Sequence, residues 1–167
     1  MQMRYRRMGT VVGVFAVLAP LLGAQSGRDA FVGTWVLDIN RSTFVEDTAV
    51  PNARMTTFEL VGDGLRQIVE TTIGNGLIDR TEYSAKFDGK DYPISNSSLD
   101  FVSLKRVAPR KMERLGKRRA TGDKIVETST REVSADGRTL TITSNGIDSS
   151  GREYRTLQIY MRSEGKR

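Results

Sequence analysis

The chain has 167 residues, no cysteine and no histidine, and it carries 26 Lys and Arg against 20 Asp and Glu. This length suits one domain, and 38% hydrophobic with 28% charged residues suits a modest core under a solvated surface. The absence of histidine excludes a Ser-His-Asp triad and imidazole metal ligands. The absence of cysteine excludes thiol nucleophiles, disulfides and zinc knuckles.

The first 24 residues read as a secretory signal peptide. Three arginines and no acid occur in the first eight residues, an apolar run follows from Val11 to Leu22, and small residues come next. This order is typical of a signal, and the run of about 12 residues is shorter than the roughly 20 of a membrane span. We expect cleavage after Ala24 or Ser26 and export to the periplasm or medium. An uncleaved N-terminal anchor is the alternative.

Residues 28–163 are expected to form a single β-domain. Turn dipeptides such as Asp88-Gly89 and Asn145-Gly146 recur between segments rich in Thr, Val, Ile, Tyr and Phe. Closing an antiparallel meander removes its exposed edges, so the pattern predicts an all-β, up-and-down barrel of about 8–10 strands. A two-sheet sandwich is the alternative. Strands are expected near 31–38, 55–61, 65–72, 79–87, 90–94, 99–107, 110–116, 124–133, 138–145 and 153–162.

The segment around Gly33-Thr34-Trp35 resembles the Gly-x-Trp start of the first strand in the calycins, which include lipocalins and fatty-acid-binding proteins. The resemblance implies a lipocalin-like barrel in which Trp35 plugs the closed end. The segments 38–44 and 87–93 resemble those of secreted bacterial lipocalin-like proteins of no assigned function. The likeness spans residues 31–162 but rests on few of them.

Two departures from fatty-acid-binding proteins bear on the ligand. Those proteins have a helical pair between their first two strands, whereas residues 39–54, with Pro51, are too few and too irregular for one. Their carboxylate anchor is Arg-x-Tyr in the last strand, and the matching positions here read Gln158-Ile159-Tyr160. The comparison therefore argues against a fatty acid held by a buried arginine and leaves a neutral or amphiphilic ligand open.

We expect a barrel that binds a small, largely apolar or amphiphilic molecule without altering it. The last predicted strand has a polar face that suits a ligand cavity better than a solid core, although this face would also suit solvent. We expect a monomer with no cofactor and no metal ion. The residues expected to line the cavity are Trp35, Phe58, Tyr83, Phe87, Phe101, Tyr154, Gln158 and Tyr160.

A basic stretch at residues 105–124 supports a second function. Such a surface could bind anionic lipid or polysaccharide of the cell envelope, since each basic residue near an anionic membrane contributes about 1 kcal/mol. It would equally serve as a solvated hairpin that resists edge-to-edge pairing. With no aromatic residue for base stacking, it does not suit nucleic acid. The residues concerned are Arg110, Lys111, Arg114, Lys117, Arg118 and Arg119.

Catalysis has little support in the sequence. A carboxylate-based hydrolase or isomerase would need two acids about 5–10 Å apart in a pocket. The candidates are Glu59, Glu70 and Glu82, which fall in predicted strands whose inward faces the sequence does not identify. We therefore expect that the protein is not an enzyme.

Overall fold

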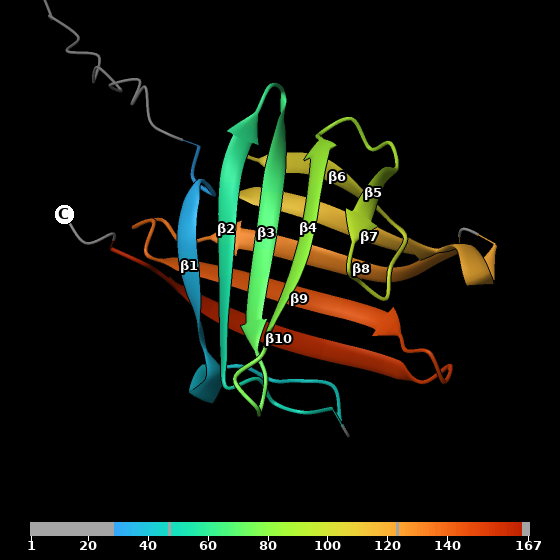
Figure 1. Ribbon diagram of the computed structural model, residues 1–167. Helices are drawn as coiled ribbons and strands as arrows, with labels where there is room; N and C mark the ends of the chain where they lie inside the picture. The colour runs from blue at the N-terminus through green and yellow to red at the C-terminus, as the bar shows by residue number, and fades with distance from the viewer. Residues whose placement is uncertain (1–28, 47, 123, 165–167) are drawn as a thin grey trace, which may run out of the picture.

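The computed structural model describes residues 29–46, 48–122 and 124–164 (Figure 1). The predicted signal peptide lies outside these residues. Within them, no helix is long and apolar enough to span a membrane. The elements in chain order are β1 (Gly33–Asp38), η1 (Ile39–Arg41), β2 (Ala53–Val61), β3 (Gly64–Thr72), β4 (Ile78–Lys86), β5 (Tyr92–Ser95), β6 (Phe101–Ala108), β7 (Lys111–Arg118), η2 (Arg119–Thr121), β8 (Lys124–Val133), β9 (Thr139–Ile147) and β10 (Glu153–Arg162).

The predicted strands are confirmed, because each one begins and ends within two residues of an observed strand. The turns between them follow the expected chemistry. Gly62, Gly89 and Gly137 adopt φ values of 58°, 73° and 71° at the ends of their hairpins, a backbone conformation that glycine adopts without a steric penalty.

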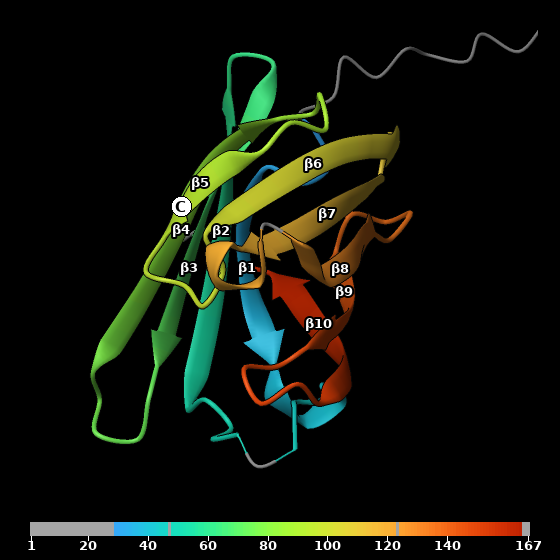
Figure 2. The same ribbon diagram turned by 90° about the vertical axis from the view of Figure 1, so that its right-hand side faces the viewer.

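The strands form one closed antiparallel barrel. Each strand pairs with the next, and β1 pairs with β10, so the sheet has no free edge. This confirms the predicted barrel and excludes the sandwich. In Figure 1, β1 to β4 stand upright in front, and β6 to β10 run across behind them. The short strand β5 joins the two halves, as the turned view in Figure 2 shows.

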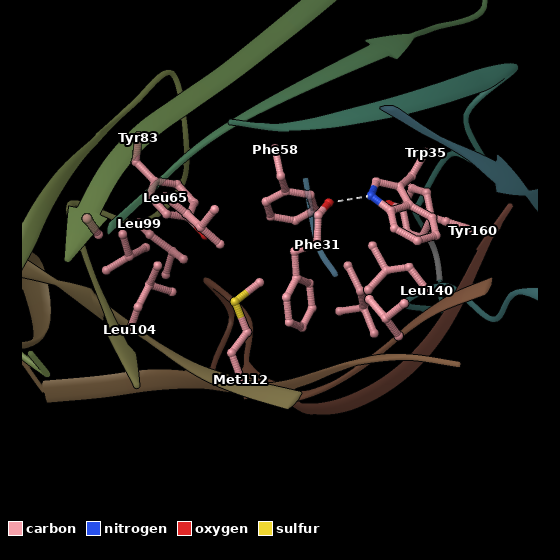
Figure 3. Close-up of a cluster of buried hydrophobic side chains, with 14 of the residues drawn as sticks. Phe31, Trp35, Phe58, Leu65, Tyr83, Leu99, Leu104, Met112, Leu140 and Tyr160 are labelled. Atoms are coloured by element: carbon pink, nitrogen blue, oxygen red, sulfur yellow. Dashed lines mark hydrogen bonds between the residues drawn. The ribbon is translucent and has the colours of Figure 1, made fainter. Parts of the chain in front are cut away.

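One end of the barrel, where β1 begins and β10 ends, is filled by its own side chains (Figure 3). We call it the packed end. Trp35 is completely buried there, and its indole nitrogen donates to the backbone oxygen of Phe31 at 2.8 Å. The rings of Phe31 and Phe58 meet edge to face, with centroids 6.1 Å apart, a favourable aromatic geometry. Met112 and Leu140 close the remaining space.

Arg162 holds the packed end together. Its guanidinium lies 4.0 Å from the centroid of the Trp35 ring, within cation–π range. Its Nη1 and Nη2 donate to the backbone oxygens of Val32 and Ala30 at 2.8 and 2.6 Å, and its Nε donates to that of Gly137 at 2.6 Å. One side chain of the last strand therefore ties down the start of the first strand and the turn between β8 and β9.

Gly33 leaves room for this contact. Its φ is 131°, and a Cβ at this position would lie 2.8 Å from Nη1 of Arg162. The glycine of the Gly-x-Trp segment is therefore required for two reasons, its backbone conformation and the close approach of the arginine.

Replacing Arg162 with methionine removes the ring contact and three hydrogen bonds to carbonyl oxygens. Hydrogen bonds to charged groups contribute about 1.5–3 kcal/mol each, and partial solvation reduces this, so we expect R162M to lower the free energy of unfolding by about 3 kcal/mol. The measurement is urea unfolding followed by the fluorescence of Trp35, the single tryptophan. R110M, at an exposed arginine, is the control; equal stability of the two variants would contradict this role for Arg162.

Candidate ligand cavity

The half of the barrel away from the packed end contains a cavity of about 410 Å³. This is within the range of small-molecule sites. The cavity exists because inward positions in this half carry polar side chains that do not pack into a solid core. The strands contribute Arg54, Gln67, Val69, Thr81, Tyr83, Ile94, Arg114, Glu127, Arg131, Ile142, Ser144, Thr156, Gln158 and Tyr160 to its wall.

The connection between η1 and β2 covers the mouth of this cavity. Phe44, Val45, Thr48 and Ala49 all line it. The connection is held to β10 through Thr43, whose backbone nitrogen donates to the Leu157 oxygen at 2.7 Å and whose hydroxyl accepts from the Leu157 nitrogen at 2.8 Å. As predicted, the described part of this connection contains no helical pair. An irregular segment takes its place.

Arg131, on β8, lies in the cavity wall and is only 3% exposed. Its Nη1 donates to the Gln67 side-chain oxygen at 2.9 Å and to the Tyr83 hydroxyl at 2.6 Å. The Gln67 nitrogen donates to the Thr56 hydroxyl at 2.9 Å, which directs the amide oxygen toward the arginine. Nε of Arg131 has no hydrogen-bond partner among the described residues. Burial, together with the nearby charge of Arg114, lowers the pKa of Arg131.

A second buried arginine is neutralised within the protein. Arg114, on β7, forms an ion pair with Glu127 on β8, and it also donates to the Ser129 hydroxyl at 3.4 Å. The Tyr154 hydroxyl donates to the other oxygen of Glu127 at 2.8 Å. Burial raises the pKa of Glu127, but the charge of Arg114 and the Tyr154 hydrogen bond outweigh burial and leave that pKa below its ordinary value. Glu127 is therefore a carboxylate at neutral pH.

These arginines change the view of the cavity that the sequence suggested. The last strand lacks the arginine of an Arg-x-Tyr anchor, as noted above. However, Arg131 places a buried cation in the interior from β8, whereas the Arg-x-Tyr anchor belongs to the last strand. Arg54 adds a further, half-buried cation, whose Nε donates to the Thr71 hydroxyl at 3.1 Å.

The structure divides the residues expected to line the cavity into several groups. Tyr83, Gln158 and Tyr160 lie in its wall. Trp35 and Phe58 point inward but belong to the packed end, and they are 0% and 1% exposed. Contact with a ligand remains a prediction for each of these residues.

The other three expected residues do not line this cavity. Tyr154 reaches only the edge of the cavity, where its hydroxyl donates to Glu127. It also lines shallow pockets near the β9–β10 turn. Phe87 is half-buried beneath the Arg106 guanidinium, 4.1 Å from its ring centroid, and Phe101 lies under Arg119 at 4.9 Å. Phe87 follows the end of β4, and Phe101 pairs with Lys117, whose side chain lies outside the barrel. Both phenylalanines therefore stack with arginines away from the cavity.

The basic stretch is less available to an anionic surface than its sequence predicted. Arg114 was expected on the surface but points into the barrel, because it lies two residues from Met112 and from Gly116 and therefore shares their inward face. Arg110 is exposed. The others have partners on the protein: Lys111 with Glu132 at 3.5 Å, Lys117 with Asp91 at 2.7 Å, Arg118 with the Ser98 oxygen at 3.1 Å, and Arg119 with the Phe101 ring.

The three glutamates considered for catalysis lie on the outer face of β2, β3 and β4. They form an ion-pair network with two arginines rather than a pair of acids in a pocket. Among the residues the structure describes, no cluster of acidic side chains is suited to hold a metal ion. The contacts join Arg66 to Glu59 at 3.3 Å and to Glu82 at 2.6 Å, and Arg80 to Glu70 at 3.4 Å and to Glu82 at 3.1 Å.

The Arg114–Glu127 pair gives a test of stability. Removing one member of a buried ion pair costs about 3–5 kcal/mol, whereas replacing both by apolar residues is often neutral. We therefore expect E127Q to lower the free energy of unfolding at pH 7 by about 3 kcal/mol, and R114M/E127M to recover most of the loss. E59Q, on the outer face, is the control and should cost less than about 1 kcal/mol.

The pH dependence follows from the lowered pKa of Glu127 in the folded state. A carboxyl of this kind stabilises the fold at pH values above its unfolded pKa of about 4.3, and the stabilisation is lost as the pH falls through the folded pKa. Between neutral pH and pH ~3, wild-type protein should therefore lose more stability than E127Q. Parallel curves for the two proteins in urea unfolding would show that Glu127 does not carry this effect.

Comparisons with known proteins show a similarity of fold and no match of sequence. No protein-family model and no curated protein matches the sequence. Among solved structures, zebrafish ileal bile acid-binding protein in complex with cholic acid is similar with a TM-score of 0.50 and 13% identity, over 80% of this chain and 99% of that one.

Two further structures are similar at lower scores. A redesigned β-barrel has a TM-score of 0.46 and 14% identity, over 81% of this chain and 93% of its own. The siderocalin Ex-FABP has a TM-score of 0.41 and 13% identity, over 83% and 77%. The similarity to the bile acid-binding protein is one of fold alone, and it agrees with the closed, lipocalin-like antiparallel barrel of this chain.

Proposed function

We propose that this protein is an exported carrier that holds a small amphiphilic molecule in its barrel and does not alter it chemically. The observation that supports this proposal most directly is the cavity of about 410 Å³ within a closed barrel. Apolar side chains such as Val69, Ile94 and Ile142 share its wall with a larger number of polar and charged ones. Polar groups in the wall of a small-molecule site fix the orientation of the ligand.

The division of the barrel into two halves favours this function. The packed end contains the aromatic core and supplies stability, so the other half is free to remain hollow. The fold similarity to a protein crystallised with cholic acid supports a ligand-binding function. That protein's ligand does not identify the ligand of this one.

The state of the interior carboxyl favours binding over catalysis. General acid–base catalysis at neutral pH needs a group whose pKa lies near the working pH. The pKa of Glu127 is lowered, and its two oxygens are occupied by Arg114 and Tyr154. This environment stabilises a fixed charge.

Ligand binding can be tested with N-phenylnaphthylamine, an uncharged dye that fluoresces in apolar sites. We expect the chain without its first 24 residues to bind this dye, and S144F to bind it about tenfold more weakly because the new ring fills the cavity. T143F is the matched control, since the neighbouring side chain lines a shallow pocket on the outside of the barrel. Absence of dye binding, or equal loss in both variants, would contradict the proposal.

Trp35 is a poor reporter for this experiment, because it lies in the packed end and does not line the cavity. Native mass spectrometry after mild purification provides a second measurement. A retained small molecule that is lost in S144F and kept in T143F would locate natural ligand in the cavity.

Export requires its own test. Expressed at full length in a Gram-negative host, the protein should be recovered from the periplasm or medium. Its intact mass should correspond to a chain that begins at Gln25 or Gly27. These two residues follow the predicted cleavage positions. Recovery of the uncleaved chain in the membrane fraction would instead support the N-terminal anchor.

A further inference from the structure

The charges in the cavity wall do not balance. Three arginines line it, namely Arg54, Arg114 and Arg131, whereas Glu127 is the acidic residue among the described lining residues. Glu127 forms its ion pair with Arg114. Arg131, which is 3% exposed, therefore has no carboxylate of its own in the described part of the chain.

An uncompensated buried cation is costly. Removing an ion from water costs several kcal/mol even after the protein relaxes, and neutral hydrogen bonds repay only part of this. Arg131 donates such bonds to Gln67 and Tyr83 through Nη1, and its Nε donates none to the described residues. Because an arginine remains protonated at neutral pH, the wall of the cavity carries a positive charge that an anion would neutralise.

The rest of the cavity suits an apolar body attached to that anion. Val69, Ile94, Ile142 and Phe44 share the wall with Arg131. A molecule with an apolar body and a charged end could therefore lie against these side chains while its charged end meets the guanidinium.

We propose that the cavity selects amphiphiles with one negative charge, such as a carboxylate or a sulfonate, and holds that group beside Arg131. This inference rests on the proposed carrier function and names its ligand class. A single charge is favoured because Glu127 already neutralises Arg114 and would repel a second anionic group next to it. Arg54 is half-buried, so solvent compensates part of its charge.

Two dyes that differ by one charge test the inference. N-phenylnaphthylamine is neutral, and anilinonaphthalene sulfonate has the same aromatic framework with one sulfonate. We expect wild-type protein to bind the sulfonate at least about tenfold more tightly than the neutral dye. Titrations at low and at moderate salt should preserve this ratio, since buried charges are screened less than exposed ones.

Two substitutions should move the ratio in opposite directions. R131M replaces the buried cation by an apolar chain of similar length, so it should lower the affinity for the sulfonate to about that for the neutral dye and abolish the preference. E127Q leaves Arg114 without a counter-ion, so it should increase the preference. A merely structural effect would lower binding of both dyes in both variants. R110M, at an exposed arginine of the packed end, is the control and should match wild type.

The outcomes separate this inference from the carrier function. If wild type binds neither dye, the carrier function fails. If wild type binds both dyes equally, or if R131M keeps the preference, the cavity binds small molecules and the assigned charge selectivity is wrong. Loss of the preference in R131M, with E127Q shifted the other way, supports Arg131 as the anion site.

Discussion

The structure depends on the closure of the ring between its first and last strands. Pairing between β1 and β10 places Trp35 opposite Arg162, and the arginine then covers the indole and binds three carbonyl oxygens. Without this contact the barrel would have two free edges and an unsealed core. Because the packed end is sealed by its own residues, the other half can tolerate an interior that is partly polar and partly empty.

The interior thus has two parts with different physical roles. At the packed end, aromatic and aliphatic groups exclude water and supply stability. In the cavity, side chains such as Gln67 and Arg131 oppose close packing because their polar groups need partners. This polarity is unfavourable for stability and favourable for recognition. Under the proposed carrier function, the barrel would select its ligand through the charge and hydrogen-bonding capacity that its own groups leave unmatched.

The fold could be predicted from the sequence because its signals are local. Asp88-Gly89 and its equivalents mark the turns, and the alternation through Tyr83 and Ala85 marks an inward face. The residues of the cavity were harder to predict from the sequence. On β8, Glu127 and Arg131 alternate with threonines and a further glutamate, so both faces are polar and periodicity does not identify the inner one. Arg114 was placed on the surface for the same reason, and Arg162 was not singled out because its partners are distant in sequence.

The pairing of β1 with β10 also constrains when this chain can fold. The hydrogen bond from Arg162 to the backbone oxygen of Val32 joins residues that are 130 positions apart in the sequence. The aromatic core therefore cannot be sealed until the final strand is present. Contacts between such distant segments slow folding, because a long loop must close before they contribute. A polypeptide that is threaded through a translocation pore with its N-terminus leading would therefore stay in an open, transport-competent state until its last residues emerged.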